Sequence, residues 1–145
     1  IVSNETVAKD IQDCKVLRPM QSMTVDRVGI KGMPAYSPDD LRFPKEAGGL
    51  GFLISINYYD IYYAGNTQII PEMSLIQPDI AILPINGEGT LDVDQAVELV
   101  KQLKPRWVIP SHWGALGEAA TLVDVQRLKD EVADTAEVII LSQSR

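Results

Sequence analysis

Apolar residues recur with the helical period most clearly in residues 93–104. Five of them share one face of the helix that this spacing predicts: Val93, Ala96, Val97, Val100 and Leu103. Asp92 and Gln95 have the spacing of a capping box at the start of this segment, and Pro105 ends it because proline cannot continue a helix. The pattern therefore predicts an amphipathic helix that buries one face.

Two further segments have the same period. Residues 122–133 follow Thr121 and Asp124, which again have capping-box spacing. Residues 5–13 are a shorter candidate whose apolar face is formed by Val7, Ala8 and Ile11. We expect the two longer helices to pack on the same side of the molecule.

Runs of aliphatic and β-branched residues predict the strands. Residues 50–56 and 61–64 are separated by Asn57–Asp60, which indicates an antiparallel hairpin. Three nearly continuous apolar runs alternate with the helices, and such runs are typical of strands buried on both faces; they are residues 79–85, 106–110 and 137–141. This order predicts a βαβαβ unit with parallel strands.

The first third of the chain gives weaker signals. Short strand candidates lie at residues 14–17 and 28–31, with a polar connection between them. Residues 34–49 contain several turn-forming residues and are expected to be a long loop, a kind of segment that often carries function. Together the patterns predict one α/β domain over residues 1–145.

Composition excludes several classes of protein. The 145 residues are 46% hydrophobic and 23% charged, as in ordinary globular domains. A net charge of −7 disfavours a nucleic-acid partner, and no apolar run approaches the roughly 20 residues that span a bilayer. Cys14 is the single cysteine, so we expect a reducing compartment, the cytoplasm. Ile1–Thr6 look like a strand already under way, which predicts that the sequence is a fragment.

Three places could carry chemistry. Asn66 follows a predicted strand after Gly65, His112 follows another strand, and Pro34–Pro38 opens the long loop. Ligands of α/β proteins gather at the carboxyl edge of the sheet, where these residues are expected to lie. Each place alone is equally compatible with an ordinary turn or, for the only histidine, with a structural role.

The order of these segments resembles the later part of a metallo-β-lactamase-fold hydrolase. The resemblance covers nearly the whole chain and rests on four spaced motifs: Pro34-Ala35-Tyr36-Ser37; Tyr63–Thr67 followed by Ile70–Met73; Asp79–Ile85; and Val108–Gly114. It implies a partial fold of the αββα sandwich type, with a mixed sheet covered by helices. It also implies hydrolysis by a water bound to one or two divalent ions, zinc or sometimes manganese or iron.

The chain departs from the family pattern at its metal ligands. The family's His-x-His-x-Asp-His cluster is not in this sequence, and Asn66 stands where the family has an aspartate that bridges two metals. Phe43 stands where close relatives have a histidine, and Ser37 where this branch commonly has asparagine. Only His112 matches a ligand, and one imidazole cannot hold a catalytic ion.

We therefore expect a homologue whose metal site has degenerated, with no cofactor and no catalytic activity of its own. Trp113 is a candidate pocket wall together with Ser37 and Phe43. The alternative is an active zinc hydrolase whose ligand cluster lies outside the given sequence. A third possibility is an unrelated small α/β binding module, although no Gly-rich phosphate loop is present.

The resemblance also predicts a partner. Half of such a fold would expose one sheet face, and large apolar patches seldom remain exposed on monomers. We expect a second copy of the chain, as a homodimer, or a preceding segment of the same polypeptide to cover this face.

Overall fold

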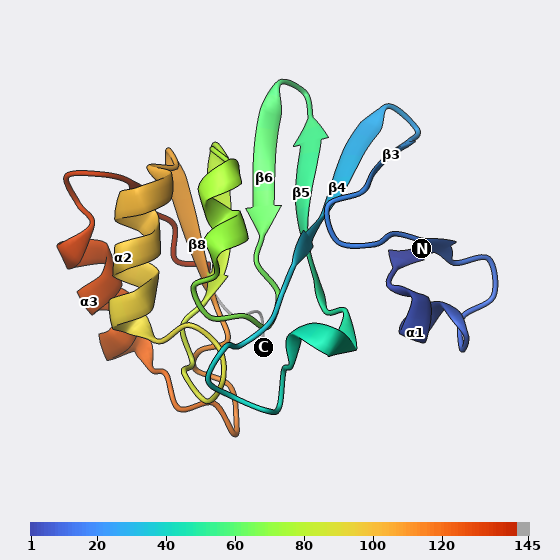
Figure 1. Cartoon of the computed structure of the whole chain (residues 1–145). Helices are drawn as coiled ribbons and strands as arrows, with labels where there is room; N and C mark the ends of the chain where they lie inside the picture. The colour runs from blue at the N-terminus through green and yellow to red at the C-terminus, as the bar shows by residue number, and fades with distance from the viewer. Residues whose placement is uncertain (142–145) are drawn as a thin grey trace.

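The computed structural model describes residues 1–141 as a mixed seven-stranded sheet with helices against one face (Figure 1). The strand order is β3-β4-β5-β6-β7-β8-β9. The strands are β3 (Ser22–Val25), β4 (Val28–Pro34), β5 (Leu50–Ile56), β6 (Tyr59–Tyr63), β7 (Ile80–Pro84), β8 (Trp107–Ser111) and β9 (Glu137–Val138). Pairing is antiparallel from β3 to β6 and parallel from β6 to β9. This arrangement confirms the predicted α/β class with a mixed sheet.

The predicted βαβαβ unit is confirmed from β7 to β9. Its helices are α2 (Val93–Leu103) and α3 (Leu122–Glu131), and both capping boxes form at their starts. Lys104 ends α2 in the left-handed region, with φ 50°. β9 is shorter than predicted because its strand pairing ends at Val138, although the Ile139 N–H still donates to the Val108 carbonyl oxygen at 2.8 Å.

The first helix is the least accurate prediction. α1 covers only Glu5–Ala8, capped by the Asn4 side chain, and not residues 5–13. None of its residues is buried, so no packing extends it, and Asp13 takes a positive φ of 59° that a helix excludes. Beyond it, β1 (Val2–Ser3) pairs in parallel with β2 (Lys15–Val16), which lies within the predicted strand 14–17.

Both hairpins turn through two left-handed residues. In the β5–β6 hairpin these are Asn57 and Tyr58, with φ 51° and 68°, so the predicted four-residue turn is wrong and β6 begins at Tyr59. Positive φ at both central positions matches the twist of paired strands, which explains the shorter turn. β3 was missed in the sequence; it pairs with β4, which extends the predicted strand 28–31 to Pro34, and the connection is Asp26–Arg27.

The helices cover only one face of the sheet, so the prediction of strands buried on both faces is wrong for this chain. On the covered face Tyr62, Ala81 and Val108 are 0% exposed. On the other face two rows of apolar side chains are only half-buried, apart from Tyr63 at 37% exposed. Their members in strand order are Ile54, Ile61, Ile80 and Trp107, and Phe52, Tyr63, Ile82 and Ile109. We call these eight residues the open face.

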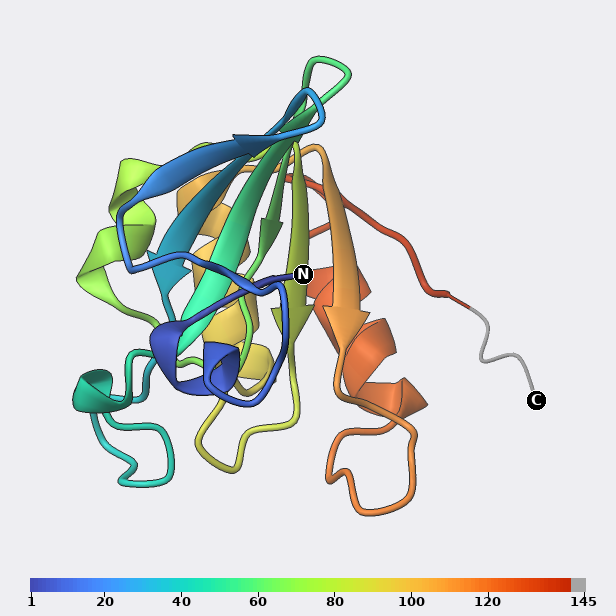
Figure 2. The same ribbon diagram turned by 90° about the vertical axis from the view of Figure 1, so that its right-hand side faces the viewer.

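The N-terminal segment lies on the side of the open face. Figure 2 shows this segment on the near side of the sheet and α2 behind it. Leu17 is 1% exposed, and it packs so closely over β4 that a side chain at Gly32 would meet Leu17 and the Arg18 carbonyl oxygen, the latter at 2.7 Å. Within residues 1–141, no helix is long and apolar enough to cross a membrane.

Candidate functional site

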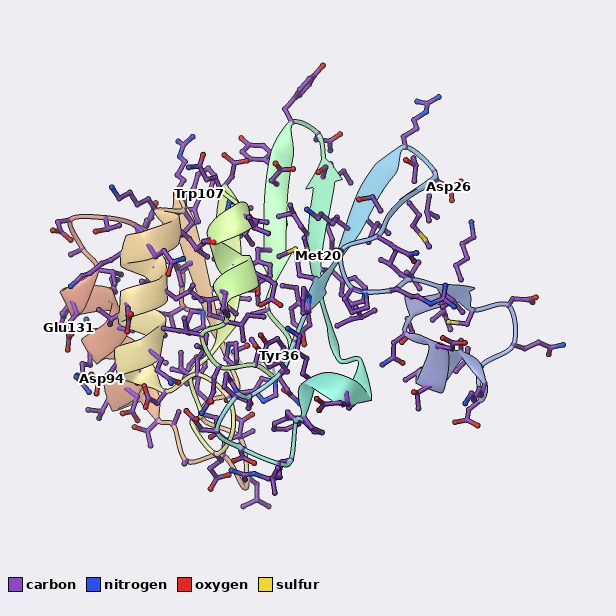
Figure 3. All side chains as sticks on the ribbon, viewed as in Figure 1. Met20, Asp26, Tyr36, Asp94, Trp107 and Glu131 are labelled. Atoms are coloured by element: carbon purple, nitrogen blue, oxygen red, sulfur yellow. The ribbon has the colours of Figure 1, made fainter. Side chains whose placement is uncertain are left out.

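The carboxyl ends of β4, β6, β7 and β8 meet at one edge of the sheet. β4 and β6 run in the same direction because each is antiparallel to β5, and β7 and β8 are parallel to β6. The loops that leave these strands project together at the lower end of the molecule (Figure 2). In Figure 3 Tyr36 lies below the strands, toward these loops, and Trp107 lies near the upper end of the molecule. We call the lower end the loop edge.

Asn66 lies at the loop edge, in the turn that follows β6, and it is exposed. The next residue, Thr67, is 0% exposed and fixes this turn to the loop after β4. The Thr67 Oγ1 accepts a hydrogen bond from the Tyr36 N–H at 3.3 Å and lies 2.9 Å from the Tyr36 carbonyl oxygen, to which it can donate. The position of Asn66 is therefore defined by a buried contact between two strand-end loops.

The loop after β7 packs against the loop after β4. The Ser37 hydroxyl donates a hydrogen bond to the Gly89 carbonyl oxygen, and Ser37 is 4% exposed. The N–H of Leu91 donates to the Thr67 carbonyl oxygen at 2.8 Å. Ser37 borders a cavity of about 190 Å³, but its hydroxyl is engaged in holding the two loops together.

His112 follows β8 with a positive φ of 57°, which is uncommon for a residue other than glycine. Its Nδ1 lies 3.8 Å from Oε1 of Glu118, and the other oxygen of Glu118 accepts from the Ala115 N–H at 3.3 Å. The imidazole is half-buried. Neighbouring Trp113 donates its indole N–H to the Pro110 carbonyl oxygen at 3.1 Å and packs against the core.

His112 and Asn66 share the loop edge but leave from strands on either side of β7. Two strand spacings of about 4.8 Å separate the strands themselves. Asn86, at the end of β7, joins the neighbouring loop: its Oδ1 accepts from the N–H of Ala119 at 2.6 Å and of Ala120 at 3.3 Å. The four loops therefore form one hydrogen-bonded assembly.

A polar network that the sequence does not predict joins Glu72 to the loop after β4. The Tyr36 hydroxyl donates to Glu72 Oε2 at 3.1 Å, and Lys45 Nζ donates to Glu72 Oε1 at 3.0 Å. Burial raises the pKa of Glu72, but hydrogen bonds from Lys45, from its own backbone N–H and from Tyr36 hold that pKa below its usual range. The hydrogen bond to Glu72, and after it one from Lys45 Nζ to the Tyr36 hydroxyl oxygen at 3.5 Å, raise the pKa of Lys45. The only sequence signal was the position of Tyr36 in a turn-rich loop.

The donor set at the loop edge does not fit a catalytic zinc ion. Within residues 1–141, no group of three or more His, Cys, Asp or Glu side chains could hold a metal. His112 offers one imidazole, and Asn66 offers only a neutral amide oxygen. Catalytic zinc requires about three protein ligands and one open position.

Asn66 and Phe43, both predicted site residues, border one cavity of about 230 Å³. Phe43 is half-buried and forms part of an apolar wall contributed by the loop after β4. Arg42 also borders this cavity, but its side chain is engaged by Asp40. The Arg42 Nε–H donates to both carboxylate oxygens of Asp40, each at 3.0 Å. The Arg42 hydrogen bonds lower the pKa of Asp40 to about 2.

Comparison with known proteins gives consistent results. A family described as "Beta-lactamase superfamily domain" matches residues 3–112. A "UPF0173 metal-dependent hydrolase" of Thermococcus onnurineus is 36% identical over 123 residues, which are 81% of this chain and 54% of that protein. The chain thus spans about half the length of such relatives.

Two solved structures share the architecture. A protein of Parabacteroides distasonis described as a metal-dependent hydrolase superposes with a TM-score of 0.82 and 27% identity, over 99% of this chain and 64% of that one. A metallo hydrolase from Ignicoccus hospitalis gives a TM-score of 0.77 and 26% identity, over 97% of this chain and 62% of that one.

Proposed function

The chain belongs to the metallo-β-lactamase superfamily, in its UPF0173 family of metal-dependent hydrolases, and we propose that it is a homologue whose loop edge binds a ligand without a catalytic metal. The observation that carries this proposal is the neutral carboxamide of Asn66 at the end of β6, where the family pattern has an aspartate. Hydrolysis by this chain alone would need ligands that residues 1–141 do not supply.

The retained framework supports a binding role. Thr67 and Ser37 are buried and hold the strand-end loops in one arrangement, as a ligand site requires. Phe43 supplies apolar surface at the position where close relatives have a histidine. Cys14 as the single cysteine supports a cytoplasmic location.

A second candidate function is zinc-dependent hydrolysis by a longer polypeptide. The relative lengths favour it, because the chain covers only 54% of the Thermococcus onnurineus protein and the family's His-x-His-x-Asp-His cluster could lie in the remainder. In that case His112 would be one ligand of several. Zinc would lower the pKa of a bound water and so supply the nucleophile.

Metal content distinguishes the two candidates. The protein is purified without chelators or metal-affinity resin, and zinc, manganese and iron are measured by elemental mass spectrometry together with the intact mass. The first proposal predicts a folded protein with far less than one metal per chain, and no change in His112→Ala. A stoichiometric metal that is lost in His112→Ala and retained in the surface control Glu98→Gln would contradict it.

We also propose that a second copy of the chain covers the open face when these 145 residues stand alone. Two rows of isoleucine and aromatic side chains are half-buried there, and β1 and β2 already begin a second layer on the same side. In a polypeptide as long as the relatives, the part that this chain does not cover would pack on the open face instead. Light scattering should give a dimer mass, and Ile80→Asp, at the centre of the open face, should give a monomer. A monomer that remains soluble without the substitution would contradict the homodimer.

A further inference from the structure

The cavity beside Asn66 has apolar walls and room for a small molecule. Its apolar lining comes from the loop after β4 and the start of β5: Ala35, Phe43, Pro44, Ala47 and Leu50. The volume of about 230 Å³ lies below the range of about 300–1,000 Å³ typical of small-molecule sites. The body of a fitting ligand is therefore small and apolar.

Asn66 offers the polar contact for such a ligand. Its side chain is exposed at the cavity, and within residues 1–141 its carboxamide has no hydrogen-bond partner. A carboxamide has both a donor and an acceptor, so it can pair with the amide of a ligand through two hydrogen bonds. A ligand ester could accept one bond from the same group.

The charges around the cavity disfavour an anion. Arg42 is held by Asp40, with an Nη2 to Oδ2 distance of 2.6 Å, and Lys45 is held by Glu72. Glu88 adds a second negative charge near Arg42. The strand-end loops, residues 35–49, 65–70, 85–91 and 112–120, together contain two basic side chains, Arg42 and Lys45, and five carboxylates: Asp39, Asp40, Glu46, Glu88 and Glu118. An anionic ligand would meet paired cations and an excess of negative charge.

We propose that this cavity binds a neutral small molecule with an apolar body and an amide or ester group, and that Asn66 recognises that group. The inference rests on the proposed function for its location at the loop edge and adds the chemical class of the ligand. Phe43 contacts the apolar body, and the acidic loops select against carboxylates and phosphates of the same shape.

Benzamide and benzoate test this selection because they have nearly the same shape and differ in charge. Each is titrated into ¹⁵N-labelled protein, and binding is followed by NMR through the Asn66 side-chain NH₂ and the backbone of residues 35–50. Benzamide is expected to shift these signals and to bind about tenfold more tightly than benzoate, because benzoate must lose hydration beside unbalanced carboxylates.

Substitutions locate the contact. Asn66→Ala should weaken benzamide binding about tenfold, because the paired hydrogen bonds are lost. Phe43→Ala should weaken benzamide binding as well. Asn57 is an exposed asparagine at the far end of the sheet. Asn57→Ala is therefore the matched control and should leave binding unchanged. Shifts outside the cavity, or benzoate affinity equal to that of benzamide, would overturn the proposal.

The metal content of the same samples separates this inference from the proposed function. Stoichiometric zinc together with benzamide shifts at Asn66 would refute the metal-free site and support the ligand class. Metal-free protein that does not respond to benzamide would refute the ligand class alone.

Discussion

The Thr67 hydroxyl contacts both backbone polar groups of Tyr36, 3.3 Å from its nitrogen and 2.9 Å from its carbonyl oxygen. A buried side chain thereby joins the loops after β4 and β6, which are far apart in the sequence. Asn66 precedes Thr67 and lies at the cavity because of this contact. Stability and the position of the candidate site thus depend on the same hydroxyl.

Thr67→Val should destabilise the protein by about 1–3 kcal/mol, because the shape is kept but the buried Tyr36 N–H loses its partner. Thr67→Ser retains the hydroxyl and serves as the control. Urea unfolding measures both. Equal losses in the two variants would mean that the methyl group, not the hydrogen bonds, provides the stabilisation.

Tyr62→Phe should leave stability unchanged or raise it by up to about 1 kcal/mol. The Tyr62 hydroxyl is buried and has no hydrogen-bond partner among residues 1–141, and burial raises the pKa of this group. Removing an unsatisfied buried hydroxyl removes its desolvation cost. Tyr36→Phe is the matched comparison, because its hydroxyl is bonded to Glu72, and it should destabilise. A clear loss in Tyr62→Phe would indicate a buried water bound to the hydroxyl.

Local signals in the sequence were sufficient to predict the parallel half of the fold. Asp92 with Gln95 and Thr121 with Asp124 form capping boxes between residues three apart, so the spacing alone identified both helix starts. Asn66 and His112 each follow a predicted strand, and this position alone indicated the carboxyl edge of the sheet. α1 failed because too few apolar positions were available to pack it.

The contacts that hold the candidate site could not be predicted in this way. Ser37 reaches Gly89, 52 residues away, and Tyr36 reaches Glu72, 36 residues away. Pairings of this kind depend on how the loops pack in three dimensions. The sequence showed the turn residues in each loop but not which loops touch.

Gly89→Ala should be more destabilising than Gly48→Ala, although both glycines have positive φ, 88° and 64°. A Cβ at Gly89 would lie 2.9 Å from Oδ2 of Asp40, whereas a Cβ at Gly48 would meet nothing within 4 Å. Gly48→Ala should therefore cost only the left-handed strain of about 1–2 kcal/mol. Unfolding free energies compare the two, and Asp40→Ala should recover part of the additional loss at Gly89. Equal losses of unfolding free energy in the two variants would show that the loop after β7 can move away from Asp40 at no cost.

Lys45→Met should reduce stability at pH 7 but not at pH 2. The folded pKa of Glu72 lies below its ordinary value of 4.5, so this carboxylate stabilises the fold above that pH, and the contribution disappears as pH falls through the folded pKa. Lys45 donates one of the bonds responsible, but its side chain is 59% exposed, so solvent screens the pair. The loss at pH 7 should be about 0.2–1 kcal/mol. Urea unfolding of the wild type and Lys45→Met at both pH values measures it, with Lys101→Met, an exposed lysine on α2, as the control. A difference that persists unchanged at pH 2 would mean that Lys45 stabilises through its contact with the Tyr36 ring, 4.8 Å from the ring centroid, and not through Glu72.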